Sequence, residues 1–260
     1  MKIAMLSLSI QGAKVIAALR EHFTDADVFL HADVEGFTDC TRFDRVIELV
    51  PTIFHKYKAL VFVMPCGVII RALADLPRDK HSDPAVIMLD VGGRYAVSLL
   101  SGHEGGANDL AVRISNAIGA EPVISTTSEA VKNIIAGVGC QRGIPADRLV
   151  EAIKGAAQQA DIRIEDIRYI ASADIKADEE GLIAAAKELD IPLRFIASDQ
   201  IRNTRREFTC TKLAQEKVNL PAVSEPAALL AGQRTELILP KTSFNGITVA
   251  LARENCSSLE

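Results

Sequence analysis

The segment Ser98–Ala111, SLLSGHEGGANDLA, runs from an apolar stretch through three glycines into an amphipathic helix. Glycines let a ligand approach backbone N–H groups, and a helix start favours negative charge, so this turn suits an anion or a developing oxyanion. A histidine in the turn can act as a general acid or base near neutral pH. We therefore predict catalytic roles for Ser101, His103 and Glu104, with Glu104 orienting His103 or carrying a proton itself. The predicted substrate-binding residues of the turn are Gly102, Gly105, Gly106 and Asn108, and Asn108 or Asp109 is expected to cap the helix.

Other interpretations of the same turn stay open. A tight strand-to-helix connection with a surface histidine would also need glycines. The segment matches neither the dinucleotide pattern G-x-G-x-x-G nor the P-loop pattern, so it gives little support for a nucleotide site. Ser101 followed by Gly102 is not a G-x-S-x-G elbow, so a serine hydrolase is also poorly supported.

Cationic side chains follow a second turn of the same kind. Gly67 comes after the apolar run Ala59–Pro65 and begins a helix, with Arg71 one turn further on. Turns at the carboxyl edge of an open α/β sheet are where ligands bind, and we expect both glycine turns there. A local positive cluster in an acidic chain suits an anionic small molecule, although these residues can also be ordinary loop or helix charges. We predict substrate-binding roles for Gly67, Arg71, Lys80 and Arg94.

The second half of the chain repeats the pattern of glycines and polar residues after apolar runs. Gly137 and Gly139 lie in GVGCQRG, and Lys176 and Glu179 lie just after the next apolar run. We predict these four residues as further substrate-binding positions, with Lys176 either binding a carboxylate or simply solvated. Glu225 begins a helix, where its charge suits the helix dipole without any further role.

The alternation of apolar runs with amphipathic stretches favours an α/β fold. We predict two domains, residues 1–130 and 131–260, each with a mostly parallel sheet flanked by helices, and a boundary in the polar segment 125–133. Gly92 and Gly93 predict a hairpin between strands at 85–91 and 94–100, and Gly119 is expected to end the helix that follows the His103 turn. Further strands are expected at 2–9, 26–32, 45–50, 59–65, 121–126, 134–140, 166–173, 193–197, 235–240 and 246–253, and helices at 11–23, 68–76, 145–160, 178–190 and 225–232.

Composition excludes several classes of protein. The 260-residue chain has a net charge of −5 and no dense Lys/Arg cluster, which argues against a nucleic-acid partner. Its five cysteines are scattered without a C-x-x-C pair, so we expect reduced thiols in a cytoplasmic protein and no protein metal site. The N-terminal apolar run is interrupted by polar residues, and no run approaches the roughly 20 apolar residues of a membrane span.

The segment KHSDPAVIMLDVGGRYAVSLLSGHEGGANDLA, residues 80–111, resembles the signature of the CbiG family, the cobalt-precorrin-5A hydrolases of anaerobic cobalamin biosynthesis. MPCGVIIRALA resembles the preceding block of that family. GVGCQRGIPADRLVEAI, IASADIKADEEGL, AVSEPAALLA and LILPKTSFNGITVALAR resemble its C-terminal domain, which also occurs alone as CobE of the aerobic route. Members commonly carry an additional segment between the two blocks, which this chain lacks. Glu104 stands where the family commonly has an apolar residue.

The resemblance implies a hydrolase that opens the δ-lactone of a cobalt-bound tetrapyrrole, releases acetaldehyde and yields cobalt-precorrin-5B. It implies that cobalt arrives with the substrate and that the protein needs no cofactor of its own. His103 would then shuttle a proton, while Arg71, Lys80, Arg94 and Lys176 would hold peripheral carboxylates. The missing segment favours an alternative, a non-catalytic corrinoid-intermediate binding protein or a partner-dependent subunit. A nucleotide-binding α/β protein is a second alternative, and the sequence leaves open a homodimer or contact with other enzymes of the pathway.

Overall fold

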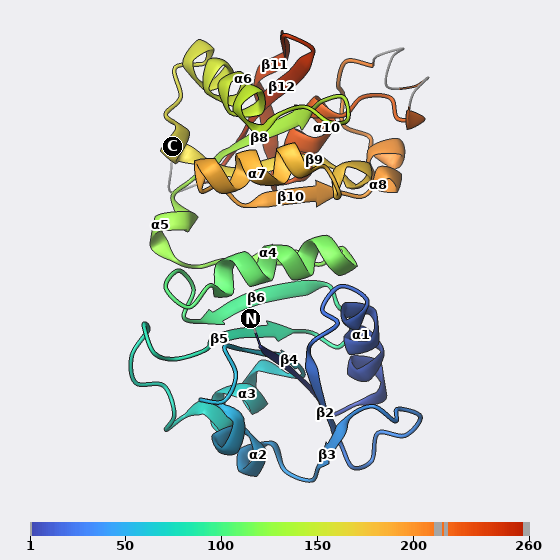
Figure 1. Ribbon diagram of the computed structural model, residues 1–260, viewed down its shortest axis with the longest axis vertical. Helices are drawn as coiled ribbons and strands as arrows, with labels where there is room; N and C mark the ends of the chain where they lie inside the picture. Colours follow the sequence, from blue (N-terminus) through green and yellow to red (C-terminus); the bar gives the residue numbers. More distant parts are fainter. Residues whose placement is uncertain (1, 211–214, 216–217, 257–260) are drawn as a thin grey trace. The chain divides into compact units, whose positions relative to one another are not determined.

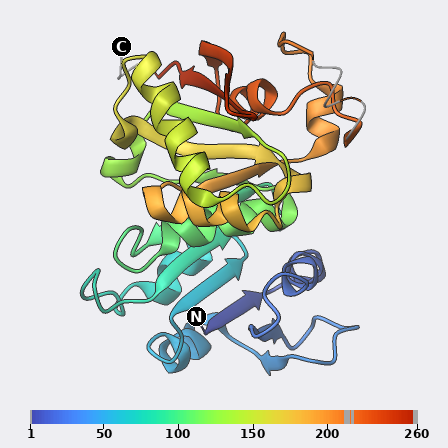
Figure 2. The same ribbon diagram turned by 45° about the horizontal axis from the view of Figure 1, so that its top comes forward.

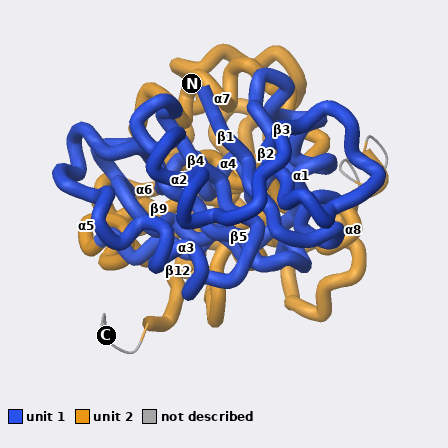
Figure 3. Tube along the Cα trace, turned by 90° about the horizontal axis from the view of Figure 1, so that it is seen from below, with its two compact units in different colours: residues 1–126 blue, residues 127–260 orange. Residues whose placement is uncertain are grey.

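A computed structural model of the chain describes residues 2–210, 215 and 218–256. The chain divides into two compact units, Met1–Thr126 and Thr127–Glu260 (Figures 1 and 3). The division between these units falls within the polar segment 125–133, four residues before the expected limit at 130/131 and just ahead of the short helix α5 (Thr127–Ala130). Within the described residues, every helix is too short or too polar to cross a membrane.

A seven-stranded sheet in the order β3-β2-β1-β4-β5-β6-β7 forms the centre of the first unit. Neighbouring strands are parallel except β5 and β6, which form the antiparallel hairpin predicted from Gly92 and Gly93. The chain proceeds outward from β1 to β3 and then returns to β4 on the other side of β1. The strands are β1 (Ile3–Ser7), β2 (Asp27–His31), β3 (Thr41–Phe43), β4 (Ala59–Val63), β5 (Ala85–Leu89), β6 (Tyr95–Leu100) and β7 (Glu121–Val123).

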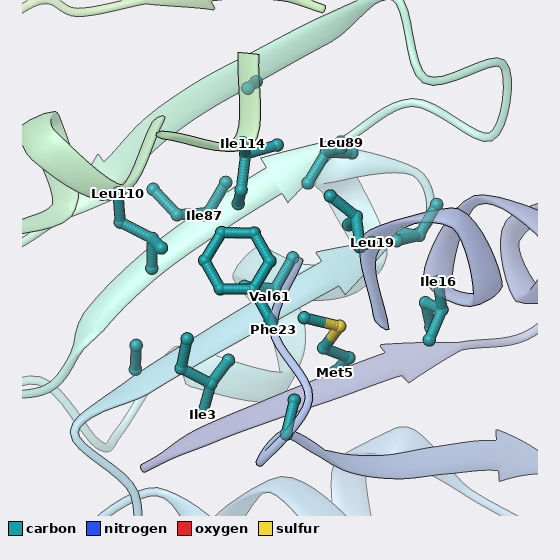
Figure 4. Close-up of a cluster of buried hydrophobic side chains, with 14 of the residues drawn as sticks. Ile3, Met5, Ile16, Leu19, Phe23, Val61, Ile87, Leu89, Leu110 and Ile114 are labelled. Carbon is teal, nitrogen blue, oxygen red and sulfur yellow. The ribbon is translucent and has the colours of Figure 1, made fainter. Parts of the chain in front are cut away.

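Helices cover both faces of this sheet. α1 (Ile10–Arg20) and α4 (Ala107–Ile118) pack on one face, where Phe23 lies among aliphatic side chains of the helices and strands (Figure 4). α2 (Val46–Ile53) and α3 (Cys66–Leu73) pack over a second core on the other face. Apolar burial on both faces explains why β4 is apolar throughout.

Residues 45–50 do not form the predicted strand but begin helix α2. Val46, Val50 and Ile53 are buried, whereas Ile47 and Glu48 are exposed. This spacing puts the buried residues on one face of a helix. Residues 45–50 end before Ile53, so they are too few to distinguish the helical period from that of a strand. The strand that precedes this helix, β3, was not predicted.

A five-stranded sheet in the order β10-β9-β8-β12-β11 forms the centre of the second unit. β8, β9 and β10 are parallel, β12 pairs antiparallel with β8, and β11 pairs antiparallel with β12. α6 and α7 cover one face of this sheet, and α10 packs against β8 on the other face. Figure 2 shows α6, in yellow-green, lying over the strands. The elements are β8 (Ile134–Gly139), α6 (Ala146–Gln159), η1 (Ile164–Asp166), β9 (Ile167–Ala173), η2 (Asp174–Lys176), α7 (Glu180–Leu189), β10 (Leu193–Ile196), α8 (Ser198–Asn203), α10 (Ser224–Leu230), β11 (Thr235–Phe244) and β12 (Ile247–Glu254). The predicted α/β class is confirmed, because helices flank the sheet of each unit. The sheet of the first unit is mostly parallel as predicted, whereas that of the second unit is mixed, because β12 returns antiparallel to β8 and forms a hairpin with β11.

Candidate functional site

The predicted glycine turn is a closed loop, residues 101–106, between β6 and α4. The amides of Gly105 and Ala107 donate to the Ser101 carbonyl oxygen, at 3.1 and 3.2 Å. The loop also uses the amides of Gly106 and Asn108, which donate to the carbonyls of His103 and Gly102. The amides of Gly102 and His103 make no hydrogen bond among the described residues. Donors for an oxyanion are therefore available at the start of the loop, and not at Gly105 and Gly106.

Close packing explains two of the three glycines. A Cβ at Gly102 would lie 2.5 Å from Thr126 Oγ1, and a Cβ at Gly105 would lie 2.4 Å from the Ser101 Cβ. Both distances are shorter than non-bonded atoms tolerate. Gly106 has φ of 81°, in the left-handed region that glycine reaches without strain, and it is the N-cap of α4. The glycines thus allow the loop to fold tightly on itself.

The expectation that Asn108 or Asp109 caps α4 is wrong, because both lie within the helix after Gly106. Asn108 is buried; its Oδ1 accepts a hydrogen bond from Ser98 at 2.8 Å, and its Nδ2 donates to Thr126 at 3.1 Å. Asn108 therefore joins β6 to the segment after β7. Ser101 is also buried, and its Oγ has no partner in the described part of the chain. A buried hydroxyl is poorly placed to attack a substrate.

Lys80 and Glu104 form an ion pair beside the loop. The hydrogen bond from Lys80 holds the pKa of Glu104 below its ordinary value, so this side chain stays a carboxylate. Since the two charges neutralise each other, Lys80 offers little to a substrate carboxylate. His103 is exposed and makes no side-chain hydrogen bond or ion pair within the described residues. It is the side chain of this loop that remains available for proton transfer.

The Lys80→Gln variant tests this pairing. Removing the ammonium group removes the hydrogen bond that lowers the pKa of Glu104, so that pKa should rise towards its ordinary value. An NMR titration of the Glu104 side-chain carboxyl measures the change. Lys56→Gln, which removes an exposed cation elsewhere in the unit, should leave the titration unaltered. An identical Glu104 midpoint in wild type and Lys80→Gln would rule the pairing out.

The predicted residues of the first unit divide between two edges of the sheet. Because β6 runs antiparallel to β5, the loop that follows Leu100 lies at the edge where the parallel strands begin. Lys80 precedes β5 and lies at the same edge. Gly67 and Arg71 follow β4, and Arg94 precedes β6, so these three lie at the opposite, carboxyl edge. The expectation that both glycine turns share the carboxyl edge is therefore wrong.

The two arginines at the carboxyl edge differ in their surroundings. Asp90 accepts hydrogen bonds from Arg94, at 2.7 Å from the amide and 3.1 Å from Nε. Burial raises the pKa of Asp90, but the amides of Tyr95 and Arg94 outweigh it and lower the pKa overall. Arg71 donates to the carbonyl of Gly67 at 2.9 Å and pairs with no carboxylate of the described residues. Arg71 is thus the more available cation.

Gly137 and Gly139 are buried in β8, where the lack of a side chain allows neighbouring elements to pack closely against the strand. A Cβ at Gly137 would lie 1.9 Å from the Ser224 carbonyl oxygen, and a Cβ at Gly139 would lie 2.6 Å from Thr248 Oγ1. These glycines let the N-terminus of α10 lie directly on β8. Their amides belong to a strand that pairs on both sides, so the structure gives them little access to a substrate.

Lys176 and Glu179 form a buried ion pair with 3.1 Å between Nζ and Oε2. The other oxygen of Glu179 accepts a hydrogen bond from the Gly143 amide at 2.7 Å, which ties the loop after β8 to the loop after β9. Beside them, an open cavity of about 530 Å³ is lined by residues that include Arg142, Asp178 and Glu180. Arg142 is paired with Asp178 at 2.9 Å. Lys176 is therefore neutralised by Glu179 and is not available to a substrate carboxylate. Because Arg142 is likewise paired, the cavity has no excess of positive charge.

Two residues at the start of α10, Ser224 and Glu225, are buried polar groups, which the sequence did not indicate. Glu225 is buried, and its carboxylate accepts hydrogen bonds from the amides of Lys241 at 2.8 Å and Thr209 at 2.5 Å. It therefore joins three segments that are distant in sequence. The neighbouring Ser224 hydroxyl is buried without a partner among the described residues. An acidic residue at a helix start is common, and nothing in the local sequence distinguishes this one.

The five cysteines are free thiols. In Cys140, burial raises the pKa of the thiol, which disfavours a reactive thiolate. Across the described residues, no group of three or more His, Cys, Asp or Glu side chains is arranged to hold a metal ion.

Comparisons with known proteins agree with the resemblance in both units. Residues 48–129 match the family model described as cobalamin synthesis G N-terminal, and residues 134–252 match the cobalamin synthesis G C-terminus. A cobalt-precorrin-5A hydrolase of Salmonella typhimurium is 24% identical over 290 positions, covering 76% of this chain and 82% of the relative. One from Priestia megaterium is 32% identical over 136 residues, covering 50% of this chain but only 36% of the relative's length. A crystal structure of CobE, from the cobalamin pathway, is 30% identical over 47% of this chain and 91% of its own, with a TM-score of 0.43.

Proposed function

Because the chain belongs to the cobalamin synthesis G family, we propose that it is a cobalt-precorrin-5A hydrolase. The observation that carries the proposal is the order of the two family domains on one chain, residues 48–129 followed by 134–252. The Salmonella hydrolase aligns with parts of both. The proposed reaction opens a δ-lactone of a cobalt-bound tetrapyrrole and releases acetaldehyde.

The reaction places two demands on the protein. Water attacks the lactone carbonyl, a transient oxyanion forms, and the ring oxygen leaves as an alcohol. Deprotonation of that alcohol lets a carbonyl form, the adjacent carbon–carbon bond breaks, and the electron pair goes to the macrocycle, which is then protonated. The site must therefore donate hydrogen bonds to an oxyanion and move protons.

The His103 loop has groups suited to both demands. The amides of Gly102 and His103 are open donors, which supports a role in binding the oxyanion. The exposed imidazole of His103 suits the proton transfers. Glu104, held as a carboxylate by Lys80, would then act by electrostatic influence and not by donating a proton.

In this proposal the substrate brings its own cobalt and the protein carries no cofactor. The partner is a small tetrapyrrole with peripheral carboxylates, and the reaction takes place in the cytoplasm. Carriage of the intermediate without turnover is the competing function.

A direct assay distinguishes the two. Purified protein mixed with cobalt-precorrin-5A should release acetaldehyde, measured by coupling to an NADH-dependent alcohol dehydrogenase. Heat-denatured protein serves as the blank. Tight binding of the intermediate by folded protein, with no aldehyde formed, would instead support the carrier function.

A further inference from the structure

A second candidate site lies at the carboxyl edge of the first unit, away from the His103 loop. A cavity of about 320 Å³ opens there, among residues that include Leu8, His31, Ile47, Val68, Arg71 and Ala72. They come from four separate stretches: the loop after β1, the end of β2, the start of α2 and the helix α3 that follows β4.

The topology explains why a cavity forms at this place. The strand order changes direction between β1 and β4, and the helices that follow these two strands pack on opposite faces of the sheet. The connections after β1 and β4 therefore diverge and leave a crevice outside the strand ends. In open α/β sheets this crevice is the usual place for a ligand.

Exposed apolar side chains lie along the same edge of the sheet as the cavity. Ile47, in the first turn of α2, lines the cavity and is 52% exposed, and Ile70, in the second turn of α3, is 55% exposed. Ile10, at the start of α1, and Val91 and Tyr95, in the β5–β6 hairpin, are exposed at the same edge. Leu8, Ile47 and Val68 line the cavity itself, and apolar side chains that line a crevice suit a ligand with a large apolar body.

Of the two arginines that line the cavity, only Arg71 is available to a ligand carboxylate. Arg71 pairs with no carboxylate of the described residues, whereas Arg45 is held by Glu48 at 2.6 Å. His31 Nδ1 is occupied by Asp33, whose amide nitrogen lies 3.2 Å and whose carboxylate oxygen lies 3.4 Å from it. Asp44 also lines the cavity, so the cationic character is concentrated around Arg71.

We propose that this crevice is a second binding site for one edge of a tetrapyrrole, separate from the His103 loop at the opposite edge of the sheet, with a peripheral carboxylate on Arg71 and the apolar rim against Leu8, Ile47 and Val68. The proposal rests on the proposed function for the identity of the ligand. The cavity is smaller than a whole macrocycle, so it holds an edge and the exposed isoleucines contact what extends beyond it. A guanidinium is well suited to a carboxylate because it presents a planar pair of N–H donors.

Binding is tested with a stable cobalt corrin that has free carboxylates, cobyrinic acid, and with its fully amidated form, which has none. Equilibrium dialysis gives the Kd for each. Wild type should bind the acid more tightly than the amide. Arg71→Gln should raise the Kd for the acid about tenfold, as expected for loss of a hydrogen bond between charged groups, with little effect on the amide. Arg71→Lys should recover part of the loss.

A second variant tests the apolar rim. Ile47→Glu puts a carboxylate beside the cavity at an exposed position that the fold does not need, and should raise the Kd for the acid at least threefold. The matched controls are Lys56→Gln, a cation at the other edge of the sheet, and Ile183→Glu, an isoleucine with 46% exposure on α7. Both controls should bind like wild type.

The outcomes separate this inference from the proposed function. Selective loss of acid binding in Arg71→Gln and Ile47→Glu supports the crevice, even if wild type releases no acetaldehyde. Equal binding in these variants and their controls would overturn it, even if wild type is an active hydrolase. Failure of wild type to bind either corrin would overturn it as well.

Discussion

His103→Gln should lower kcat for acetaldehyde release by about 10²- to 10⁴-fold, the usual contribution of a positioned general acid or base. Glutamine keeps a polar side chain of similar length but cannot take up and release a proton in the range where imidazole does. Because His103 is exposed and its side chain makes no hydrogen bond or ion pair within the described residues, the substitution should leave the fold intact. KM should change little, since the lost step is proton transfer and not binding.

The matched control is His22→Gln, which removes another exposed histidine from the turn after α1. Its kcat should equal that of wild type. Added imidazole should partly restore turnover in His103→Gln, because the exposed position lets a small base reach the site. A kcat within a few-fold of wild type, with the fold intact, would show that the proton passes through another group.

The sequence singles out His103 as a candidate because all the observations lie within one short segment. The strand, the glycines, the histidine and the following helix are consecutive, and the resemblance extends over the same residues, 80–111. Local chemistry of this kind depends little on the rest of the fold. The three glycines nevertheless predict more free amides than the loop has, because the amides of Gly105 and Gly106 donate to carbonyls within the loop.

The position of each turn within the sheet depended on strand direction. Gly92 and Gly93 predicted the β5–β6 hairpin, and a hairpin reverses the second strand, so the His103 loop had to leave from the edge opposite to Gly67 and Arg71. The two turns look alike in sequence because both join a strand to a helix. Only the pairing of the strands shows that they lie at different edges.

The crevice near Arg71 was missed for a related reason. His31 ends β2, Ile47 follows β3 and Arg71 follows β4, and only the strand order β3-β2-β1-β4 brings these positions together. No spacing along the chain reveals this. The predicted strand at 45–50 also concealed the site, because Ile47 lines the cavity from the first turn of a helix.

Gly137→Ala should destabilise the second unit by about 3 kcal/mol, a value in the upper part of the range for overpacked cores. The new Cβ would lie 1.9 Å from the carbonyl oxygen of Ser224 and 2.7 Å from the amide nitrogen of Ala228. Both are backbone atoms of α10, so no side-chain rotation relieves the clash. The helix must move away from β8, and burial of Ser224 and Glu225 is lost with it. Thermal unfolding followed by circular dichroism should show a Tm lower by roughly 10 °C.

Gly155→Ala is the control that makes this result interpretable, since it adds the same methyl group within the same unit. Gly155 lies in the interior of α6, and its Cβ would meet only the ring of Phe244, at 3.0 Å from Cε1. A ring can shift by a few tenths of an ångström, and alanine is favoured over glycine within a helix by up to about 1 kcal/mol. The Tm of Gly155→Ala should therefore equal or exceed that of wild type. If Gly137→Ala were as stable as Gly155→Ala, then α10 would not rest on β8, and Gly137 would be free for the ligand-binding role that its neighbours in sequence suggest.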